Sequence, residues 1–374
     1  MKSIGIGMIG TGFMAKTHSI ACTQYPMMTW PPAALPVKKV ICDVIPGQAE
    51  ESARRFGYER FCSDYRQVLS DPEVDLVIIT TPNHLHAQIA QEAAQAGKHI
   101  LCEKPLGRNA AESRQMLSAA EKAGVKAMPA FNYRRLPAVA LAKKLLSDGA
   151  LGRPLRFIGC YLQDSGASPQ VPFAWRNSKA AAGSGVLGDI GTHLLDIARY
   201  LAGEITEVAG SLRTVYPQRP SAENPAVFKP VDVDDEFMTL LRFENGAQGT
   251  LTASRTAWGR NNFIGFELYC EKGAVRFDLE HNGELQVYLE SDPPHLRGFR
   301  TVATGERHPN GCFLWPMPGM GIGYSEPLMI QLHELLTAIA EGTAAIPSFY
   351  DGWRVDCICE AITRSSDTGR WEKT

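Results

Sequence analysis

The sequence predicts an α/β protein with a doubly wound parallel sheet in its first third and a separate, open antiparallel sheet in the remainder. Three observations predict this fold. Apolar strand-like runs alternate with helical segments up to about residue 130, as they do around parallel sheets. A glycine-rich turn of the dinucleotide-binding type follows the first of these strands. Beyond about residue 150, strand-like runs are instead separated by hairpin turns such as "ENG" and "HNG".

The first element contains a glycine-rich turn that can be read in two registers. In "IGIGMIGTGFMAKTH", the pattern G-x-G-x-x-G/A fits from Gly5 or from Gly10. A start at Gly5 would leave only "MKSI" for the preceding strand, which is too short for the centre of a sheet. We therefore predict that "SIGIGMI" is the strand, that Gly10 makes the tight turn, and that Gly12 lets a pyrophosphate approach the first amides of the next helix. Gly5 and Gly7 then lie in the strand, where a neighbour packs closely. The candidate cofactor contacts in this turn are Gly10, Gly12, Phe13 and Met14.

The second strand, "VKKVICD", is predicted to end at an acidic residue. The Asp43 carboxylate would accept hydrogen bonds from an adenosine ribose and repel a 2′-phosphate, which favours NAD over NADP. The alternative is an ordinary turn residue at a strand end. The distance from Gly12 to Asp43 exceeds the usual gap of about 20 residues. We attribute the excess to the Pro-rich segment 25–36, "YPMMTWPPAALP", which is predicted to be an inserted loop.

Three further strands are predicted in "DLVIITTP", "HILCEKP" and "VKAMPAFN", with the helices "HAQIAQEAAQAGK" and "AAESRQMLSAAEKAG" between them. Ligands of open α/β sheets bind at the carboxyl ends of the strands. Lys104 follows the second of these strands, where an ammonium group could hydrogen-bond a substrate hydroxyl and stabilise developing negative charge. The alternative is a surface lysine whose stem packs on the protein while its charge stays in water.

A second pair of candidate catalytic residues lies in "GDIGTHLLDIARYLAG". Asp189 and His193 are spaced i, i+4, so on a helix they share one face, with Asp196 one turn further. A histidine can take a hydroxyl proton near neutral pH, and a neighbouring carboxylate can orient it. The alternatives are a helix-start aspartate with a hydrogen-bonded structural histidine, or a set of metal ligands. We expect no metal because no further cluster of ligand-type residues is evident.

Three of these motifs, "TTPNHLHAQIA", "GKHILCEKPLG" and "GDIGTHLLDIARYLAG", resemble the Gfo/Idh/MocA family of nicotinamide-dependent sugar and cyclitol oxidoreductases. The resemblance covers nearly the whole chain, and "EKP" with the Asp-x-x-x-His pair is its most specific part. It implies a Rossmann domain followed by an open antiparallel sheet. It also implies that Lys104, Asp189 and His193 face the nicotinamide across the domain cleft.

The resemblance extends to the remaining candidate residues. His86 matches the family's loop histidine and, with Thr81, Pro82 and Asn83, is expected to line the cofactor. The "FNYRR" and "AWRNS" segments are expected near the same cleft. The full cofactor-binding set adds Asp43, Glu103, Lys104, Asn132, Trp175 and Arg176 to the residues of the glycine-rich turn and the loop. The expected substrate-binding set is Lys104, Tyr133, Arg134, Asp189 and His193, with Lys104, Asp189 and His193 catalytic.

We expect an NAD-binding domain over residues 1–131 and a domain for substrate binding and oligomerisation over 132–374. Five strands are predicted in the second domain, in "EFMTLLRF", "AQGTLTASR", "FIGFELYC", "AVRFDL" and "LQVYLE". Two helices follow, in "EPLMIQLHELLTAIAEG" and "RVDCICEAITRSS", and we expect the second to return to the first domain. From the resemblance we expect a homodimer or homotetramer formed through the sheet.

Composition and charge exclude several classes of partner. The formal net charge is −2 with no long run of one sign, so neither nucleic acid nor an anionic membrane is expected. No stretch of 18 apolar residues predicts a transmembrane helix. Nine cysteines without a C-x-x-C pair are typical of reduced thiols in a cytoplasmic protein.

The function that these motifs and the resemblance favour is the reversible, NAD-dependent oxidation of a secondary hydroxyl on a sugar, anhydrosugar or inositol. Lys104 and His193 would handle the hydroxyl proton. One alternative is an oxidoreductase on the same scaffold that acts on a non-sugar substrate such as a diol. Another is a non-catalytic NAD-binding regulator, because a fold alone does not decide function. The presence of Lys104, Asp189 and His193 argues against a regulator.

Overall fold

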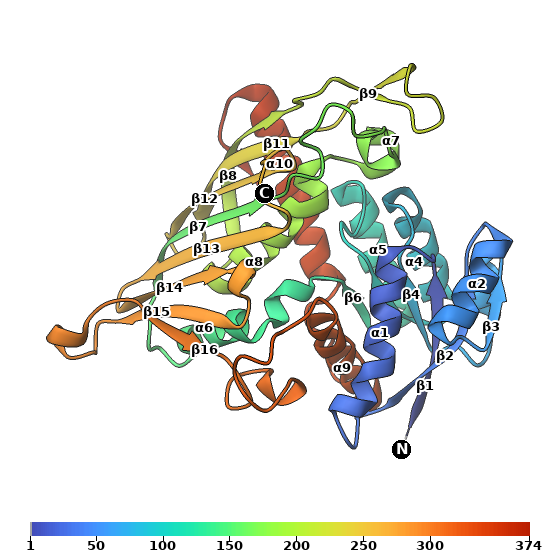
Figure 1. The fold of residues 1–374 in the computed structure, drawn as a ribbon, viewed down its shortest axis with the longest axis horizontal. Coiled ribbons are helices and arrows are strands. Elements are labelled where there is room, and N and C mark those ends of the chain that lie inside the picture. The colour runs from blue at the N-terminus through green and yellow to red at the C-terminus, as the bar shows by residue number, and fades with distance from the viewer. Residues whose placement is uncertain (1) are drawn as a thin grey trace. The chain divides into compact units, whose positions relative to one another are not determined.

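The computed structural model describes residues 2–374, which form two compact units (Figure 1). Unit one comprises Met1–Arg135 and Gly323–Trp353. Unit two comprises Leu136–Ile322 and Arg354–Thr374. Each unit is therefore assembled from two stretches that are distant in the sequence.

Unit one contains a six-stranded sheet in the order β3-β2-β1-β4-β5-β6, and all its strand pairs are parallel. This is the strand order of the doubly wound dinucleotide-binding fold, so the predicted fold class is confirmed for this part of the chain. The central strands are continuous apolar runs because both faces of a parallel sheet are covered, and all four residues of β4 are buried. The strands are β1 (Ser3–Ile9), β2 (Leu35–Cys42), β3 (Arg60–Cys62), β4 (Leu76–Ile79), β5 (His99–Cys102) and β6 (Ala127–Pro129).

The helices of unit one follow from capping signals and apolar faces in the sequence. Asn109 caps α5, because its side chain accepts a hydrogen bond from the backbone N–H of Glu112 at 2.9 Å. The same helix ends at Gly124, whose φ of 68° is left-handed. The helices are α1 (Phe13–Met28), α2 (Pro46–Phe56), α3 (Tyr65–Ser70), α4 (His86–Gln95), α5 (Ala110–Ala123) and α9 (Glu326–Glu341), with the short 3₁₀ turns η1 (Asn83–Leu85) and η2 (Asn132–Arg135).

Helix α1 is longer than the sequence predicts. We expected residues 25–36 to form an inserted loop, but α1 continues through Pro26, and residues 29–34 alone connect it to β2. Tertiary packing overrides the proline, because Tyr25 in the last turn is completely buried. Its hydroxyl lies 3.0 Å from Nδ1 of His333 on α9. The prediction of a loop over this whole segment was therefore wrong.

A segment from near the end of the chain completes unit one. We expected the last helix, α10 (Phe349–Thr368), to return to the first domain, but α9 returns as a whole and α10 contributes only its first turn. α9 packs against α1 and η2 (Figure 1), and ten of its sixteen residues are buried. The guanidinium of Arg135 is bound to the Glu334 carboxylate of α9 at 2.7 Å. The apolar surface of α9 is thus buried within unit one.

Unit two contains a nine-stranded sheet in the order β16-β15-β14-β13-β7-β12-β11-β8-β17. All its pairs are antiparallel except β7 with β12. The predicted open antiparallel sheet is therefore confirmed as the main architecture, but the parallel pair and the strands β7 and β8 were not expected. The strands are β7 (Pro154–Leu162), β8 (Ile205–Arg213), β11 (Glu236–Phe243), β12 (Gln248–Ser254), β13 (Phe263–Cys270), β14 (Gly273–Asp278), β15 (Glu284–Leu289), β16 (Arg300–Ala303) and β17 (Glu372–Lys373), with a separate pair β9 (Gln218–Pro220) and β10 (Phe228–Pro230).

The two faces of the large sheet differ in what they contact within unit two. Along β11, Phe237, Thr239 and Leu241 are buried, whereas Met238 and Leu240 between them are exposed. Helices of the same unit pack against strands of the sheet and account for its buried face. These helices are α6 (Pro137–Ser147) and α8 (Thr192–Ala202); the unit also contains α7 (Lys179–Ala182), the 3₁₀ turn η3 (Trp175–Asn177) and the π-helical turn η4 (Leu187–Gly191).

His99 at the start of β5 makes the stability of unit one depend on pH. Its Nδ1 accepts a hydrogen bond from the backbone N–H of Lys126 at 3.0 Å, which requires an unprotonated nitrogen. Partial burial lowers the pKa of His99 below its ordinary value of about 6.5. The unfolded chain therefore binds the proton first, so this stabilisation is complete above about pH 6.5 and is lost as the pH falls through the folded pKa.

We expect the midpoint of thermal unfolding to fall as the pH is lowered from 7 to 5. The variant His99→Gln keeps an acceptor for Lys126 and cannot titrate, so its midpoint should fall less steeply over the same range. Differential scanning calorimetry at closely spaced pH values measures both slopes. Parallel slopes for the two proteins would exclude His99 as a source of the dependence.

The structure also describes the cysteines and the length and polarity of the helices. All nine cysteines are free thiols, and four of them are buried. Within residues 2–374, every helix is too short or too polar to cross a membrane.

Candidate functional site

The glycine-rich turn joins β1 to α1 in unit one. Gly10 has a φ of 106°, a conformation that side chains rarely adopt, and a Cβ there would lie 2.6 Å from Oγ1 of Thr80. Gly12 is the N-cap of α1 and provides no side chain to cap the helix. A Cβ on Gly12 would meet no atom within 4 Å. The first amides of α1 therefore border open space on the side where Gly12 lacks a side chain.

The structure also explains the two earlier glycines. Gly5 and Gly7 lie within β1, as predicted. A Cβ on Gly5 would lie 1.7 Å from the backbone oxygen of Glu73, and one on Gly7 would lie 2.3 Å from Cγ1 of Val68. Both glycines therefore allow β1 to pack closely against α3 and the loop that follows it. The predicted register of strand, turn and helix is therefore confirmed.

Asp43 directly follows β2 and lies beside the glycine-rich turn. Its Oδ2 accepts a hydrogen bond of 2.6 Å from the hydroxyl of Thr11, which sits between the two glycines of the turn. Its Oδ1 accepts the backbone N–H of Ile45 at 3.1 Å. Asp43 is half-buried, and the next two side chains, Val44 and Ile45, are exposed. A carboxylate and an apolar surface thus lie together next to the turn.

The loop after β4 contains Thr81, Pro82 and Asn83. Thr81 and Pro82 are half-buried, and Asn83 is buried at the start of η1. The Oγ1 atom of Thr81 is buried and has no hydrogen-bond partner among residues 2–374. A hydroxyl left in this state is a donor and acceptor available to a ligand.

His86 does not line the cofactor site as we expected. Its side chain is completely buried, and its ring nitrogens lie 2.9 Å from the carbonyl oxygen of Thr81 and 3.0 Å from that of Pro105. Burial lowers the pKa of His86, which favours the neutral ring. The imidazole therefore joins the loop after β4 to the segment after β5 from behind, and the expectation of direct contact is corrected.

The "EKP" segment follows β5 at the carboxyl edge of the sheet. Lys104 is half-buried, and Glu103 is 6% exposed. The backbone N–H of Glu103 donates to the carbonyl oxygen of Ile79 at the end of β4. Oε1 of Glu103 lies 2.9 Å from Nε2 of His18 on α1, so this carboxylate is directed into the protein. The sequence analysis did not predict a role for His18. The signal that could have identified it is a polar ring on a helix in which Ala15, Ala21 and Cys22 are buried.

The segment after β6 is buried throughout. Asn132, Tyr133 and Arg134 are 2%, 4% and 7% exposed, and Nδ2 of Asn132 has no hydrogen-bond partner among residues 2–374. Tyr133 meets Tyr324 edge to face at a ring-centroid distance of 6.5 Å, and Tyr324 also lies 5.6 Å from the ring of Phe13. Tyr324 lies in the segment "GMGIGY", and no sequence pattern around it predicts these contacts.

These features of unit one fit a dinucleotide. Open space at Gly12 leaves room for a pyrophosphate beside helix amides. Asp43 supplies a carboxylate beside the turn. The buried Thr81 hydroxyl and Asn132 amide are polar groups that the protein itself does not satisfy. The chain thus provides donors and space at the places where the sequence predicts cofactor contacts.

Asp189 and His193 lie in unit two on consecutive helical turns. Asp189 is in the π-helical turn η4 and is half-buried. His193 is in the first turn of α8, is 4% exposed, and has its ring 6.2 Å from that of Tyr161. The π-helical turn was not predicted, and single π turns within helices are frequent at functional sites.

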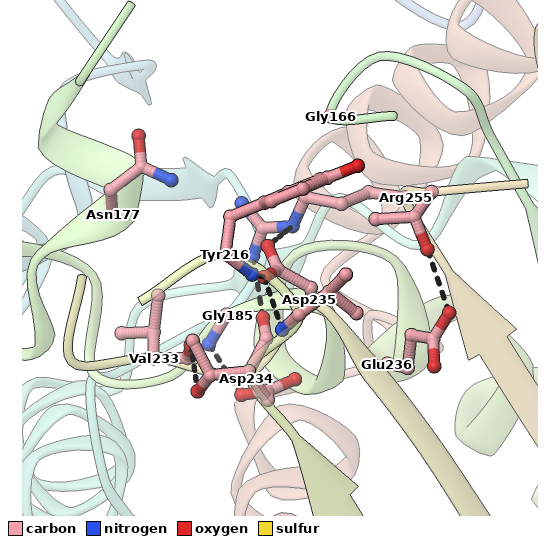
Figure 2. A network of polar contacts seen from close by, with 12 residues as sticks. Gly166, Asn177, Gly185, Tyr216, Val233, Asp234, Asp235, Glu236 and Arg255 are labelled. Carbon is pink, nitrogen blue, oxygen red and sulfur yellow. Dashed lines mark hydrogen bonds and ion pairs between the residues drawn. The ribbon is translucent and has the colours of Figure 1, made fainter. Parts of the chain in front are cut away.

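A buried carboxylate supports the loop that leads to these residues (Figure 2). Asp234 accepts 2.7 Å hydrogen bonds from the backbone N–H groups of Gly185 and Leu187, one on each oxygen. Its carbonyl oxygen accepts the N–H of Val186. Burial raises the pKa of Asp234, and the two backbone donors oppose this effect. The three consecutive residues 185–187 are therefore fixed by one residue, through both its side chain and its backbone, and the sequence analysis did not predict this role.

A cavity of about 140 Å³ opens beside Asp189 within unit two. The guanidinium of Arg176 lies on the ring of Trp175 at 4.3 Å, and its Nε is 3.7 Å from Oδ2 of Asp189. The polar residues lining the cavity include Gln163, Ser165, Arg176, Asn177, Asp189, Arg219 and Arg255.

Two of the lining arginines are held by another buried aspartate. Arg219 and Arg255 lie 3.8 Å and 3.5 Å from Oδ1 of Asp235, which is completely buried. Arg219 also donates to the carbonyl oxygen of Gly166 at 2.8 Å and so anchors the loop on one side of the cavity. Figure 2 shows Asp235 and Arg255 in this network. The cavity wall is therefore rigidly supported by charged groups.

The predicted site residues are distributed over both units. Unit one holds the glycine-rich turn, Asp43, the loop after β4, Lys104 and Asn132–Arg134. Unit two holds Trp175, Arg176, Asp189 and His193. Among residues 2–374, no three histidine, cysteine, aspartate or glutamate side chains are arranged to hold a metal ion.

Two family models match the sequence. The model described as an oxidoreductase family with an NAD-binding Rossmann fold matches residues 4–131. The model described as the GFO/IDH/MocA C-terminal domain matches residues 139–276. Together they cover more than half of the chain and include most of the predicted site residues.

Individual relatives agree with the family models. Levoglucosan dehydrogenase of Pseudarthrobacter phenanthrenivorans is 50% identical over 384 residues, covering 99% of this chain and 98% of that protein. The scyllo-inositol 2-dehydrogenase (NAD(+)) of Bacillus subtilis is 36% identical over 60% of this chain and 62% of its own length. A structure of levoglucosan dehydrogenase in complex with NADH and levoglucosan is 51% identical, covers 100% of this chain and 99% of that one, and matches with a TM-score of 0.97.

Proposed function

This chain belongs to the Gfo/Idh/MocA family of NAD-binding oxidoreductases, and on that premise we propose that it oxidises a secondary hydroxyl of levoglucosan or a closely similar anhydrosugar. The observation that carries this proposal is the full-length identity of 50% to a levoglucosan dehydrogenase. The TM-score of 0.97 to such an enzyme with NADH and levoglucosan supports it.

In this proposal, both Lys104 and His193 act on the reacting hydroxyl. Lys104 donates a hydrogen bond to the hydroxyl oxygen and stabilises negative charge as it develops there. His193 accepts the hydroxyl proton on a ring nitrogen. The cofactor, when bound, accepts the hydride from the carbon that carried the hydroxyl, which leaves a ketone. Asp189 orients the imidazole or holds the substrate from the preceding turn.

The cavity beside Asp189 suits a compact ring with several hydroxyls. Its volume of about 140 Å³ is close to the ~150 Å³ that holds one six-membered ring in other proteins. Gln163 and Asn177 on its wall can each donate and accept hydrogen bonds. The volume and the two amides favour a compact ring that carries several hydroxyls.

The proposal is tested by measuring NADH formation at alkaline pH with a panel of levoglucosan, glucose, scyllo-inositol and a simple vicinal diol. We expect levoglucosan to give the highest kcat/KM. A higher value for the inositol or the diol would overturn the substrate assignment. Tight NAD binding without turnover on any member of the panel would contradict the enzymatic proposal and favour a regulator.

We further propose that NAD is preferred over NADP because of Asp43. Replacement by alanine should reduce the discrimination against NADPH by about tenfold or more, since hydrogen bonds to charged groups contribute roughly 1.5–3 kcal/mol. Fluorescence titration with NADH and NADPH measures the ratio of the two dissociation constants. The control is Thr11→Ala, which removes the hydroxyl bound to Asp43 but keeps the carboxylate. Equal or tighter NADPH binding by the unmodified protein would refute the assignment.

We also propose that the protein forms a homodimer or homotetramer through the exposed face of the large sheet. Met238 and Leu240 are 64% and 49% exposed on β11. Ile158 on β7 is 39% exposed and belongs to the same face, because Leu240 pairs with Thr250 and Thr250 pairs with Ile158. Adjacent exposed apolar residues of this kind mark interaction surfaces.

Leu240→Glu should therefore convert the oligomer into monomers and leave NAD binding unchanged, because it places a charge among these exposed apolar residues. Light scattering coupled to size-exclusion chromatography gives the mass. Leu296→Glu is the matched control, since Leu296 is 66% exposed and lies outside the sheet strands. An unchanged mass for Leu240→Glu, or a monomeric unmodified protein, would rule out this interface.

The compartment that we propose is the cytoplasm. All nine cysteines are free thiols, including the exposed Cys312. Free thiols are typical of reducing compartments.

A further inference from the structure

The residues on both sides of Lys104 are bound by buried histidines. On the N-terminal side, Oε1 of Glu103 lies 2.9 Å from Nε2 of His18. On the C-terminal side, the carbonyl oxygen of Pro105 lies 3.0 Å from Nδ1 of His86. The two histidines come from α1 and α4, so helices on separate parts of the chain hold the "EKP" segment.

The contact of His18 differs from that of His86 because it involves a buried charge. The side chains of His18 and Glu103 are 2% and 7% exposed. The Glu103 carboxylate has two polar contacts in residues 2–374, namely the imidazole of His18 and, at 3.3 Å, the backbone N–H of Lys104. A carboxylate in such surroundings is stable only while its partners stay in place. Removal of His18 would leave the backbone of Lys104 as its remaining contact.

His18 also belongs to the helix that carries the glycine-rich turn. It lies in the second turn of α1, whose N-cap is Gly12. The hydrogen bond to Glu103 spans 85 residues of sequence and joins the start of α1 to the end of β5. Two parts of the predicted site, the turn for the pyrophosphate and the strand end with Lys104, are thus tied together by one buried pair.

We propose that His18 is a positioning residue, which holds Glu103 so that Lys104 and the glycine-rich turn keep a fixed relative position. The proposal rests on the function proposed for Lys104. The imidazole acts by donating a hydrogen bond to the carboxylate and does not touch the reacting hydroxyl. Misplacement of a catalytic group by about 1 Å can lower a rate by about 100-fold, so loss of this contact should reduce turnover more than substrate binding.

The test compares two replacements of His18. His18→Ala removes the donor and should lower kcat by tenfold or more, with KM for the sugar changed less than threefold. His18→Gln restores an N–H donor to Glu103 and should recover kcat to within about fivefold of the unmodified enzyme.

The matched control is Tyr25→Phe. Tyr25 also forms a hydrogen bond from α1 to a histidine, but its partner is His333 on α9 and not the "EKP" segment. This variant should lower the thermal midpoint and leave kcat unchanged. Equal losses of kcat in Tyr25→Phe and His18→Ala would show a general effect of α1 on folding and would overturn the proposal. Equal losses in His18→Ala and His18→Gln would also overturn it.

A double variant separates this proposal from the function assigned to Lys104. If Lys104 is the group that His18 positions, His18→Ala should cost less than threefold in kcat when Lys104 is already alanine. A full tenfold loss in that background would refute the coupling while leaving the function intact. Near-normal turnover in Lys104→Ala alone would instead refute the role of Lys104, whatever the His18 variants do.

Discussion

Replacement of Lys104 or His193 by alanine is expected to lower kcat/KM for the sugar by at least roughly 100-fold. General acid–base groups contribute about 10²–10⁴-fold, and 100-fold corresponds to about 2.7 kcal/mol of lost transition-state stabilisation. If both residues act on the same hydroxyl as proposed, the double variant should lose much less than the product of the two single losses. Steady-state kinetics on levoglucosan measures all three values.

Cofactor affinity provides the control for this prediction. His193 lies in unit two, so His193→Ala should bind NAD with nearly unchanged affinity. Lys104→Ala should lose NAD affinity modestly, because its strand end belongs to the unit that carries the glycine-rich turn. Asp189→Asn should cost less than either replacement. Near-normal turnover in His193→Ala would remove the histidine from the mechanism, and near-normal turnover in both would refute the site.

The second large effect is expected at Gly12. Gly12→Val should abolish NAD binding while the protein stays folded, because a Cβ at this position meets no protein atom within 4 Å and the side chain would instead fill the space left for the pyrophosphate. Gly5→Ala should have the opposite result. Its methyl group would lie 1.7 Å from a backbone oxygen, so the strand must shift and stability should fall steeply.

These two variants are compared by isothermal titration with NADH and by thermal unfolding. Gly7→Ala is a further control, because its new Cβ would lie 2.3 Å from the side chain of Val68 and should act on stability alone. Unimpaired binding by Gly12→Val would show that the pyrophosphate lies elsewhere. Loss of NADH binding in a fully stable Gly5→Ala variant would instead indicate that the motif starts at Gly5.

Local sequence signals were sufficient for much of the fold. The length of chain before Gly5 and the helix after Gly12 were enough to choose the register of the turn, because strand and helix need a minimum length on either side. The five strands predicted in unit two are each part of a hairpin or directly follow one. β7 was missed because both its neighbours, β12 and β13, come about 90 residues later, so no turn beside it marks its pairing.

Less of the candidate site could be predicted from the sequence, because its details depend on contacts between residues that are far apart in the chain. His86 opens a helix after a predicted binding loop, and nothing local reveals that both ring nitrogens face backbone carbonyls. Asp234 supports the loop before Asp189 from 47 residues away. A pattern shows which residue types are present, whereas burial and partners decide whether each one meets a ligand or holds a neighbour.

The divided sequence of unit one has a consequence for biosynthesis. Helix α9 is part of this unit, yet almost two hundred residues of unit two are made between Arg135 and Gly323. At about 5–20 residues per second, the ribosome needs roughly 10–40 s to reach α9 after the first segment has emerged. During that interval the nascent chain has all six parallel strands but exposes the surface of α1 on which α9 packs. The nucleotide-binding unit can thus be completed only after residues 136–322 have been translated, and a product truncated before α9 would leave this surface of α1 uncovered.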